Sequence, residues 1–284
     1  MKSLCIKTNN DKIIDYLFNK FENINLVETY ITIKEFKHYT NIILHYKDKN
    51  ITKFINMVSN ILTKCIINFY EKNFIDNIIN YNYFYFNTLE RKKISYNTLE
   101  LLNNYDDANK KYDIINNTLF QHLTNNHSLY LNGFVNFQIH DYLYFLNEKI
   151  DFAVNKFLID KEYLEYVNIL RLYINSESIN SNTNHLHLIY KDKESIIINN
   201  NKEIISCNDN ISKAKYISDI SFSSNDLALN TLLNLLPKKI TIHLTDEYDD
   251  EFINTLKLIF QERVIICQDC DICNIYKCRN IVKK

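Results

Sequence analysis

Apolar residues recur at helical spacing through one long stretch of the chain, from Phe134 to Ser176. Steps of three and four residues place them on one face of an α-helix, and no Gly or Pro interrupts the stretch. The pattern continues for about ten helical turns, and we expect a break near Asp160 that makes it a helical hairpin. The predicted buried face consists of Ile139, Leu143, Leu146, Ile150, Ala153, Phe157, Tyr163, Val167, Leu170 and Ile174.

The segment before this stretch predicts an N-terminal βαββα unit. The short run SLCIK and the alternating runs NLVETYITIKEF and TNIILHY are typical of strands, whereas KIIDYLFNKF has helical spacing. A long helical pattern begins at about Thr52 and places Cys65 on its apolar face. We expect this thiol to be part of the core, where an unpaired cysteine packs as a small apolar side chain.

The segment after the stretch predicts a β-meander followed by an αβαβ layer. Three short β runs, HLHLIYK, ESIIIN and EIISC, are separated by Asn, Asp and Lys turns. SSNDLALNTLLNLL then starts with helix-capping residues and ends before Pro237, and DDEFINTLKLIFQE starts with acidic residues. KKITIHL and RVIIC are the two strands of this layer. The fold class is therefore α+β, with an N-terminal α/β region (1–112), a central helical region (113–180) and a C-terminal α/β region (181–284) that ends in a cysteine cluster.

The composition excludes several classes of site. The chain has one Gly, Gly133, and one Pro, Pro237, so neither a glycine-rich phosphate loop nor a G-x-S-x-G nucleophile motif can be built. Asn clusters are expected to form the turns, because Asn tolerates positive φ better than most residues. Gly133 follows Asn132, and this pair is expected to be the turn that leads into the long helical stretch.

Charge and hydropathy indicate a soluble protein. The formal net charge is −1, and the basic and acidic residues are interleaved without a basic run that would mark a nucleic-acid or anionic-membrane surface. Neither a signal-peptide pattern nor an apolar run long enough to span a bilayer is present. Seven cysteines, an odd number with several clustered, fit a reducing compartment. We therefore expect a cytoplasmic protein without a transmembrane segment.

Four of the seven cysteines lie close together near the end of the sequence, in the pattern C-x2-C-x2-C-x4-C. Thiolates at such spacing can bind a tetrahedral zinc ion, and three Cys with two residues between neighbours also resemble the opening of a 4Fe–4S motif. A dithiol redox pair and a cluster without metal remain as alternatives. Zinc is the preferred cofactor, with 4Fe–4S second. The candidate metal ligands are Cys267, Cys270, Cys273 and Cys278.

Other polar residues give weaker indications. On a strand, His185 and His187 would share one face, where they could bind a metal or simply face solvent. His243 is expected in the core or at a sheet edge. Glu162 and Glu165 lie three residues apart on a predicted helix, but the Glu-x-x-His motifs of di-iron bundles are absent from the sequence. No nucleophile and base are paired in the local sequence, so catalytic residues are not predicted.

Several of these segments together resemble the YtxC-like family of sporulation proteins, found in endospore-forming Firmicutes. The resemblance covers about half of the chain, from Gly133 to Cys273. It is carried by the KEY-x-EY helix, by the LP-x-x-I-x-IH segment around Pro237 and His243, and by the final C-x-x-C-x-x-C. The family usually has an Arg where this chain has Gln138, and Cys278 belongs to none of its motifs. The resemblance implies a role in sporulation, without an established activity, substrate or catalytic residue.

Two functional hypotheses follow from the sequence. The first is a sporulation-associated cytoplasmic protein that is not an enzyme, binds an unidentified protein partner and carries a structural metal at its C-terminal cysteines. The alternative is a redox enzyme or sensor that depends on zinc or an iron–sulfur cluster at Cys267, Cys270 and Cys273.

Overall fold

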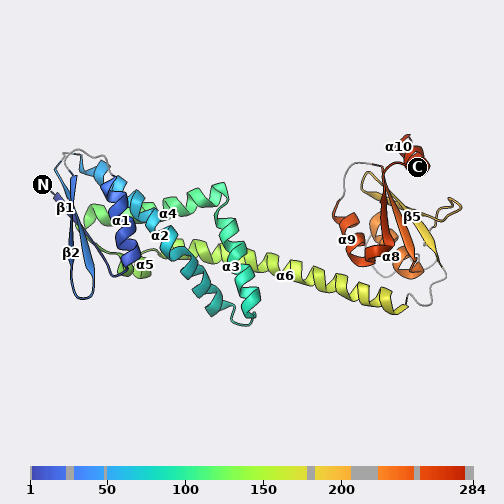
Figure 1. Cartoon of the computed structure of the whole chain (residues 1–284), viewed down its shortest axis with the longest axis horizontal. Helices are drawn as coiled ribbons and strands as arrows, with labels where there is room; N and C mark the ends of the chain where they lie inside the picture. Colours follow the sequence, from blue (N-terminus) through green and yellow to red (C-terminus); the bar gives the residue numbers. More distant parts are fainter. Residues whose placement is uncertain are drawn as a thin grey trace. The chain divides into compact units, whose positions relative to one another are not determined.

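The computed structural model describes residues 2–23, 29–47, 50–177, 183–205, 223–245 and 250–278, apart from the side chain of Cys278. The chain divides into two compact units, Met1–Ile159 and Asp160–Lys284 (Figure 1). Each unit contains one four-stranded mixed sheet together with helices, so the predicted α+β class is confirmed. The division into three sequence regions stays a prediction. Across the described residues, no helix is both long enough and apolar enough to cross a bilayer.

The N-terminal unit begins with five elements in the order β-α-β-β-α. Its sheet has the strand order β2-β3-β1-β4, in which β1 pairs antiparallel to β3 and parallel to β4. The elements of this unit are β1 (Lys2–Thr8), α1 (Asp11–Glu22), β2 (Thr29–Glu35), β3 (Thr40–Tyr46), α2 (Ile51–Asn82), α3 (Thr88–Leu102), α4 (Tyr105–Asn125), β4 (Ser128–Tyr130), α5 (Leu131–Phe137) and the first part of α6 (His140–Glu177).

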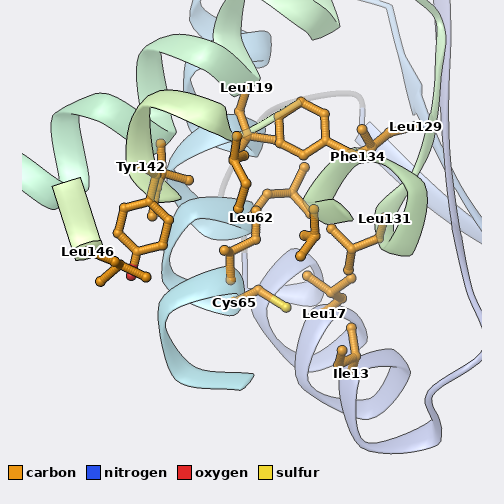
Figure 2. Packing of buried hydrophobic residues seen from close by; sticks show 14 of the residues in the cluster. Ile13, Leu17, Leu62, Cys65, Leu119, Leu129, Leu131, Phe134, Tyr142 and Leu146 are labelled. Atoms are coloured by element: carbon orange, nitrogen blue, oxygen red, sulfur yellow. The ribbon is translucent and has the colours of Figure 1, made fainter. Parts of the chain in front are cut away.

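The core of this unit is apolar and contains the predicted thiol. Figure 2 shows Cys65 of α2 among side chains from several elements, including Leu17 of α1 and Leu131 of α5. Cys65 is fully buried, and burial raises the pKa of its thiol to about 12. This cysteine is therefore a packing residue, as the sequence predicted.

A small polar network lies inside the same unit. The Lys111 amine donates to one carboxylate oxygen of Glu71 at 2.9 Å, and the Tyr142 hydroxyl donates to the other at 2.6 Å. All three residues are buried. The charged carboxylate is thus paired and hydrogen-bonded, which is the condition under which a buried charge is tolerated.

The predicted hairpin in the long helical stretch is wrong, because α6 is a single helix of 38 residues that continues through Asp160. Apolar residues as far as Phe157 pack into the core of the N-terminal unit, whereas Val167 and Ile174 belong to the core of the C-terminal unit. The packing partner therefore changes near Asp160 while the backbone stays helical. Good helix formers and the lack of Gly and Pro at this point explain why the helix does not end.

The C-terminal unit is built on a sheet with the strand order β6-β5-β7-β8. Strands β5, β7 and β8 are parallel, and β6 is antiparallel to β5. Besides the last part of α6, its elements are β5 (His185–Lys191), β6 (Glu194–Ile198), α8 (Ser224–Leu235), β7 (Lys239–Leu244), α9 (Glu251–Phe260), the 3-10 turn η2 (Gln261–Arg263), β8 (Val264–Cys267) and α10 (Asp271–Cys278).

The two faces of this sheet have different compositions. Leu186, Leu188, Ile240 and Ile242 are buried in a core that includes residues of α8 and α9. Alternate residues of β5 and β7 point to the opposite face, where the strands carry His, Thr and Lys side chains. The polar face therefore offers metal-binding groups that the apolar face lacks.

Two details at the edges of the unit differ from the sequence prediction. The third meander run does not form a full strand in the described residues: Ile204 makes an isolated bridge to Ile198, and Ser206 and Cys207 lie outside those residues. Helix α10 was not predicted, because eight residues give too short a pattern to identify.

Candidate metal centre

Four potential metal ligands meet where the strands of the C-terminal sheet end. They are His243, Cys267, Cys270 and Cys273, and one ligand atom from each lies within 4.8 Å of the others. We call this group the Cys3His cluster. His243 and Cys273 are almost fully buried, and Cys267 and Cys270 are partly buried.

The sheet brings the first two ligands together. β7 and β8 are parallel neighbours, and their register places His243 opposite Cys267. Both residues lie at the carboxyl ends of their strands, so their side chains reach the same edge of the sheet. The chain then turns back, and Cys270 begins α10 by accepting a hydrogen bond at 2.9 Å from the Asn274 backbone N–H. Cys273 lies in the first turn of that helix.

Two lysine side chains hold α10 against the end of the sheet. The Lys191 amine donates to the Tyr276 carbonyl at 2.9 Å, and the Lys277 amine donates to the Gln268 carbonyl at 2.9 Å. Carbonyls near a helix C-terminus are favourable positions for cations. These contacts support the position of the helix that carries Cys273.

Four of the distances within the cluster are close to those around one tetrahedral ion. The Cys273 sulfur lies 3.6 Å from that of Cys270 and 3.8 Å from that of Cys267. The Nδ1 atom of His243 is 3.3 Å from the Cys270 sulfur and 3.4 Å from the Cys273 sulfur. With Zn–S bonds of about 2.3 Å, tetrahedral geometry separates two sulfurs by about 3.8 Å and a sulfur from a nitrogen by about 3.5 Å. A Cys3His set is one of the usual ligand combinations of structural zinc.

The imidazole of His243 is in the protonation state that metal binding requires. Burial, followed by the neighbouring His187 and His185, lowers the pKa of His243 to about 4. The ring is therefore neutral near pH 7, and one of its nitrogens keeps a free lone pair. A neutral imidazole is the form that binds metal ions.

The thiols of the cluster differ in acidity. Burial opposes ionisation of Cys270, but hydrogen bonds from the Cys273 backbone and from the Cys267 and Cys273 thiols outweigh it and lower the pKa of Cys270. Burial, reinforced by the neighbouring thiols, raises the pKa of Cys273 to about 12. A bound divalent cation would favour the thiolate form of all three, since it neutralises their mutual repulsion.

The two histidines of β5 lie beside the cluster. The Nδ1 atom of His187 is 3.0 Å from Nε2 of His243, on the side of that ring away from the cysteines. The His185 ring contacts that of His187 with the ring centroids 4.3 Å apart and the planes tilted by 45°, and its Nε2 is 2.8 Å from the Thr241 hydroxyl. His185 and His187 share one face of β5, and neither contributes an atom to the Cys3His cluster.

The sequence therefore identified three of the four clustered residues. Cys267, Cys270 and Cys273 are brought together, whereas the side chain of Cys278, at the end of α10, lies outside the described part of the chain. His243 was not among the candidate ligands, although the structure places it in the cluster. A usable signal was available: it stands near the end of a strand that precedes an α-β pair, and the next strand ends at Cys267.

Comparison with known proteins identifies the family of this chain. A model of the YtxC-like family matches residues 56–265, which is most of the sequence. The chain belongs to the YtxC-like family. The matched range of this YtxC-like chain includes His243 and ends just before Cys267. The three cysteines of the cluster therefore lie after the matched range. Neither a curated protein nor a solved structure matches the chain.

Proposed function

We propose that this YtxC-like protein binds one zinc ion at the Cys3His cluster and that the ion has a structural role. The observation that carries the proposal is the convergence of three sulfurs and one imidazole nitrogen within 4.8 Å, from β7, β8, the turn after β8 and α10. A helix as short as α10 is unstable alone, because isolated helices need about 12–15 residues. A zinc ion would join this helix to the ends of two strands.

The spacing of the sulfurs favours a single ion over an iron–sulfur cluster. In a 4Fe–4S cube each thiolate binds a different iron, so the protein sulfurs are farther apart than two ligands of one ion. Sulfur distances of 3.6 and 3.8 Å match the single-ion case. Soft thiolates with one imidazole also favour zinc over the hard cations magnesium and calcium.

A zinc ion held by four protein ligands supports a function in binding rather than in catalysis. Catalytic zinc usually keeps one coordination position for water or substrate, whereas four protein ligands fill the tetrahedron. We propose that the protein acts in the cytoplasm during sporulation by binding a protein partner, with the zinc-stabilised C-terminal unit as part of the partner-binding surface. The resemblance to YtxC-like sporulation proteins supports the biological setting.

One observation favours a second candidate, a redox sensor. Cys270 immediately precedes α10, its sulfur is 3.6 Å from that of Cys273, and its pKa is lowered. A C-x-x-C pair at the head of a helix is the arrangement of dithiol redox proteins. In this function a disulfide-containing oxidant would take two electrons from the Cys270 and Cys273 thiolates, which would join in a new disulfide. The oxidant's own disulfide bond would break into two thiolates that take up protons from water, and the zinc ion would be released.

Metal analysis of anaerobically purified protein tests the proposal. We expect about one zinc per chain in the wild type and in Cys5→Ser, a control because Cys5 lies outside the cluster, and little zinc in Cys273→Ser. Brown protein with iron and sulfide would support an iron–sulfur cluster instead. A wild-type protein without metal, whose thermal stability is unchanged by Cys→Ser replacement in the cluster, would contradict both metal functions.

Two further measurements separate the structural role from the sensor. Removal of zinc by a chelator should lower the melting temperature of the C-terminal unit under reducing conditions. A sensor requires in addition that a disulfide oxidant releases zinc reversibly, with mass analysis showing the Cys270–Cys273 bond. A pull-down from sporulating cells, made with wild type and with Cys273→Ser, tests whether the partner requires the intact centre.

A further inference from the structure

Three imidazoles follow one another across the polar face of the C-terminal sheet, and we call them the histidine row: His185, His187 and His243. The pairing register places His187 opposite Thr241 on the neighbouring strand, two residues before His243. Side chains two residues apart on a strand share a face. His187 and His243 are therefore diagonal neighbours on adjacent strands, which explains the 3.0 Å between their nitrogens.

The two nitrogens of His243 have different surroundings. Nδ1 is directed at the sulfurs of Cys270 and Cys273, and Nε2 is directed at Nδ1 of His187. A neutral imidazole carries one proton, which resides on one nitrogen and leaves the other as an acceptor. If Nδ1 of His243 binds the metal, the proton must be on Nε2, and that N–H needs an acceptor.

We propose that His187 is a positioning residue for the metal centre: its Nδ1 accepts the Nε2–H of His243 and so keeps the Nδ1 lone pair of His243 directed at the metal. The inference rests on the proposed zinc site and names the group that orients its only nitrogen ligand. Histidine ligands in metal sites usually donate their second N–H to such a partner, which fixes both the tautomer and the ring orientation.

The same contact fixes the tautomer of His187. Because Nδ1 of His187 faces Nε2 of His243, the proton of a neutral His187 belongs on its own Nε2. The contacts thus form a directed chain from His187 to His243 and the cysteines.

The chain offers a matched control in the same row. His185 lies on the same strand and face as His187, but its Nε2 contacts the Thr241 hydroxyl and not His243. A substitution of His185 disturbs the strand and the contact between the two rings to a similar degree without removing the acceptor. His187→Asn supplies a conservative variant, because the Asn Oδ1 is bonded to Cγ as the His Nδ1 is and can accept the same hydrogen bond.

The experiment measures zinc affinity of the full-length protein by competition with a chromogenic chelator. We expect His187→Leu to weaken zinc binding by about 10–100-fold, the usual effect of removing such a partner. His187→Asn and His185→Leu should stay within about threefold of the wild type, because both retain an acceptor for His243. Cobalt(II) spectra should show the same tetrahedral thiolate coordination in all four proteins.

A measurement on the unmutated protein keeps the inference testable if a variant does not fold. Nitrogen-15 NMR of histidine-labelled protein should show the proton of His243 on Nε2, with and without zinc. A proton on Nδ1, an unchanged affinity in His187→Leu, or equal losses in His187→Leu and His185→Leu would overturn the inference alone. A wild-type protein that binds no zinc would overturn the proposed function as well.

Discussion

His243 and Cys267 lie opposite one another in the parallel register of β7 and β8, although 24 positions separate them in the numbering. This pairing places an imidazole and a thiol at one edge of the sheet before the last two cysteines are added. Strand pairing thus brings two of the four residues together, and the turn into α10 adds Cys270 and Cys273.

The identity of the fourth ligand gives the first prediction. His243→Ala should lower zinc affinity more than Cys278→Ser, because His243 places a nitrogen 3.3 and 3.4 Å from two sulfurs of the cluster. We expect about one zinc per chain in Cys278→Ser and a strongly reduced content in His243→Ala after dialysis against a weak chelator. Retention of zinc in His243→Ala together with its loss in Cys278→Ser would assign the fourth position to the cysteine.

Spacing along the sequence predicted the local part of this centre and missed its long-range part. Two residues separate Cys267 from Cys270 and Cys270 from Cys273, so one turn of chain brings them together. His243 joins them only through the pairing of β7 with β8, and that pairing is a tertiary property. In the predicted αβαβ order the two strands run parallel and end at the same edge of the sheet. That order is therefore enough to place the strand end that carries His243 beside the one that carries Cys267.

Periodicity predicted helix and strand types well but did not show where one core ends and another begins. Ile150 and Val167 lie on one continuous helix, although they pack into different cores. A change of packing partner alters the phase of the apolar pattern, as a turn would. The apolar pattern alone does not distinguish a change of packing partner from a turn. A break was therefore expected near Asp160, where α6 is continuous.

The pKa of His243 gives a prediction for metal-free, reduced protein. Its pKa falls from the ordinary 6.5 to about 4 on folding, so the folded state favours the neutral ring. The stabilisation is complete above the ordinary pKa and is lost as the pH falls through the folded value. A depression of this size corresponds to about 3 kcal/mol of unfolding free energy. Urea denaturation between about pH 7 and about pH 4 should show the loss.

Other histidines around His243 also contribute to the loss of stability at acidic pH, so the contribution of His243 has to be separated from theirs. Burial also lowers the pKa values of His185 and His187, and the positive charge of Lys239 contributes to both. These two rings should therefore add to the acid destabilisation. His243→Asn should show a shallower pH dependence than the wild type, with the remainder due to His185 and His187. Identical pH profiles would show that His243 does not titrate between the two states.

The buried ion pair of the N-terminal unit gives a prediction for stability. Lys111→Met removes the amine that lies 2.9 Å from Glu71 and leaves a buried carboxylate without its cation. We expect a loss of about 3–5 kcal/mol in the unfolding free energy. Replacement of both residues, with Glu71→Leu added, should recover much of that loss, because the uncompensated charge is removed. Urea denaturation of the single and double variants measures both effects.

A second ion pair in the same unit is the matched control. Lys149 lies 2.6 Å from Asp107, but the two side chains keep 27% and 20% of their exposure. Water screens this pair, so Lys149→Met should cost about 1 kcal/mol or less. Similar costs for Lys111→Met and Lys149→Met would show that burial does not set the energy of the Glu71 pair.

The apolar face of α6 gives the last prediction. Leu146 is fully buried in the core seen in Figure 2, whereas Tyr144, two residues earlier on the same helix, is 69% exposed. Leu146→Ala should lower the unfolding free energy by about 2–5 kcal/mol through lost burial and the cavity it leaves. Tyr144→Ala should change it by about 0.5 kcal/mol or less, because few contacts are lost. Both substitutions place Ala in a helix, so the difference between them in urea denaturation measures packing rather than helix propensity. Equal stabilities of the two variants would mean that this face of α6 is not part of the core in solution.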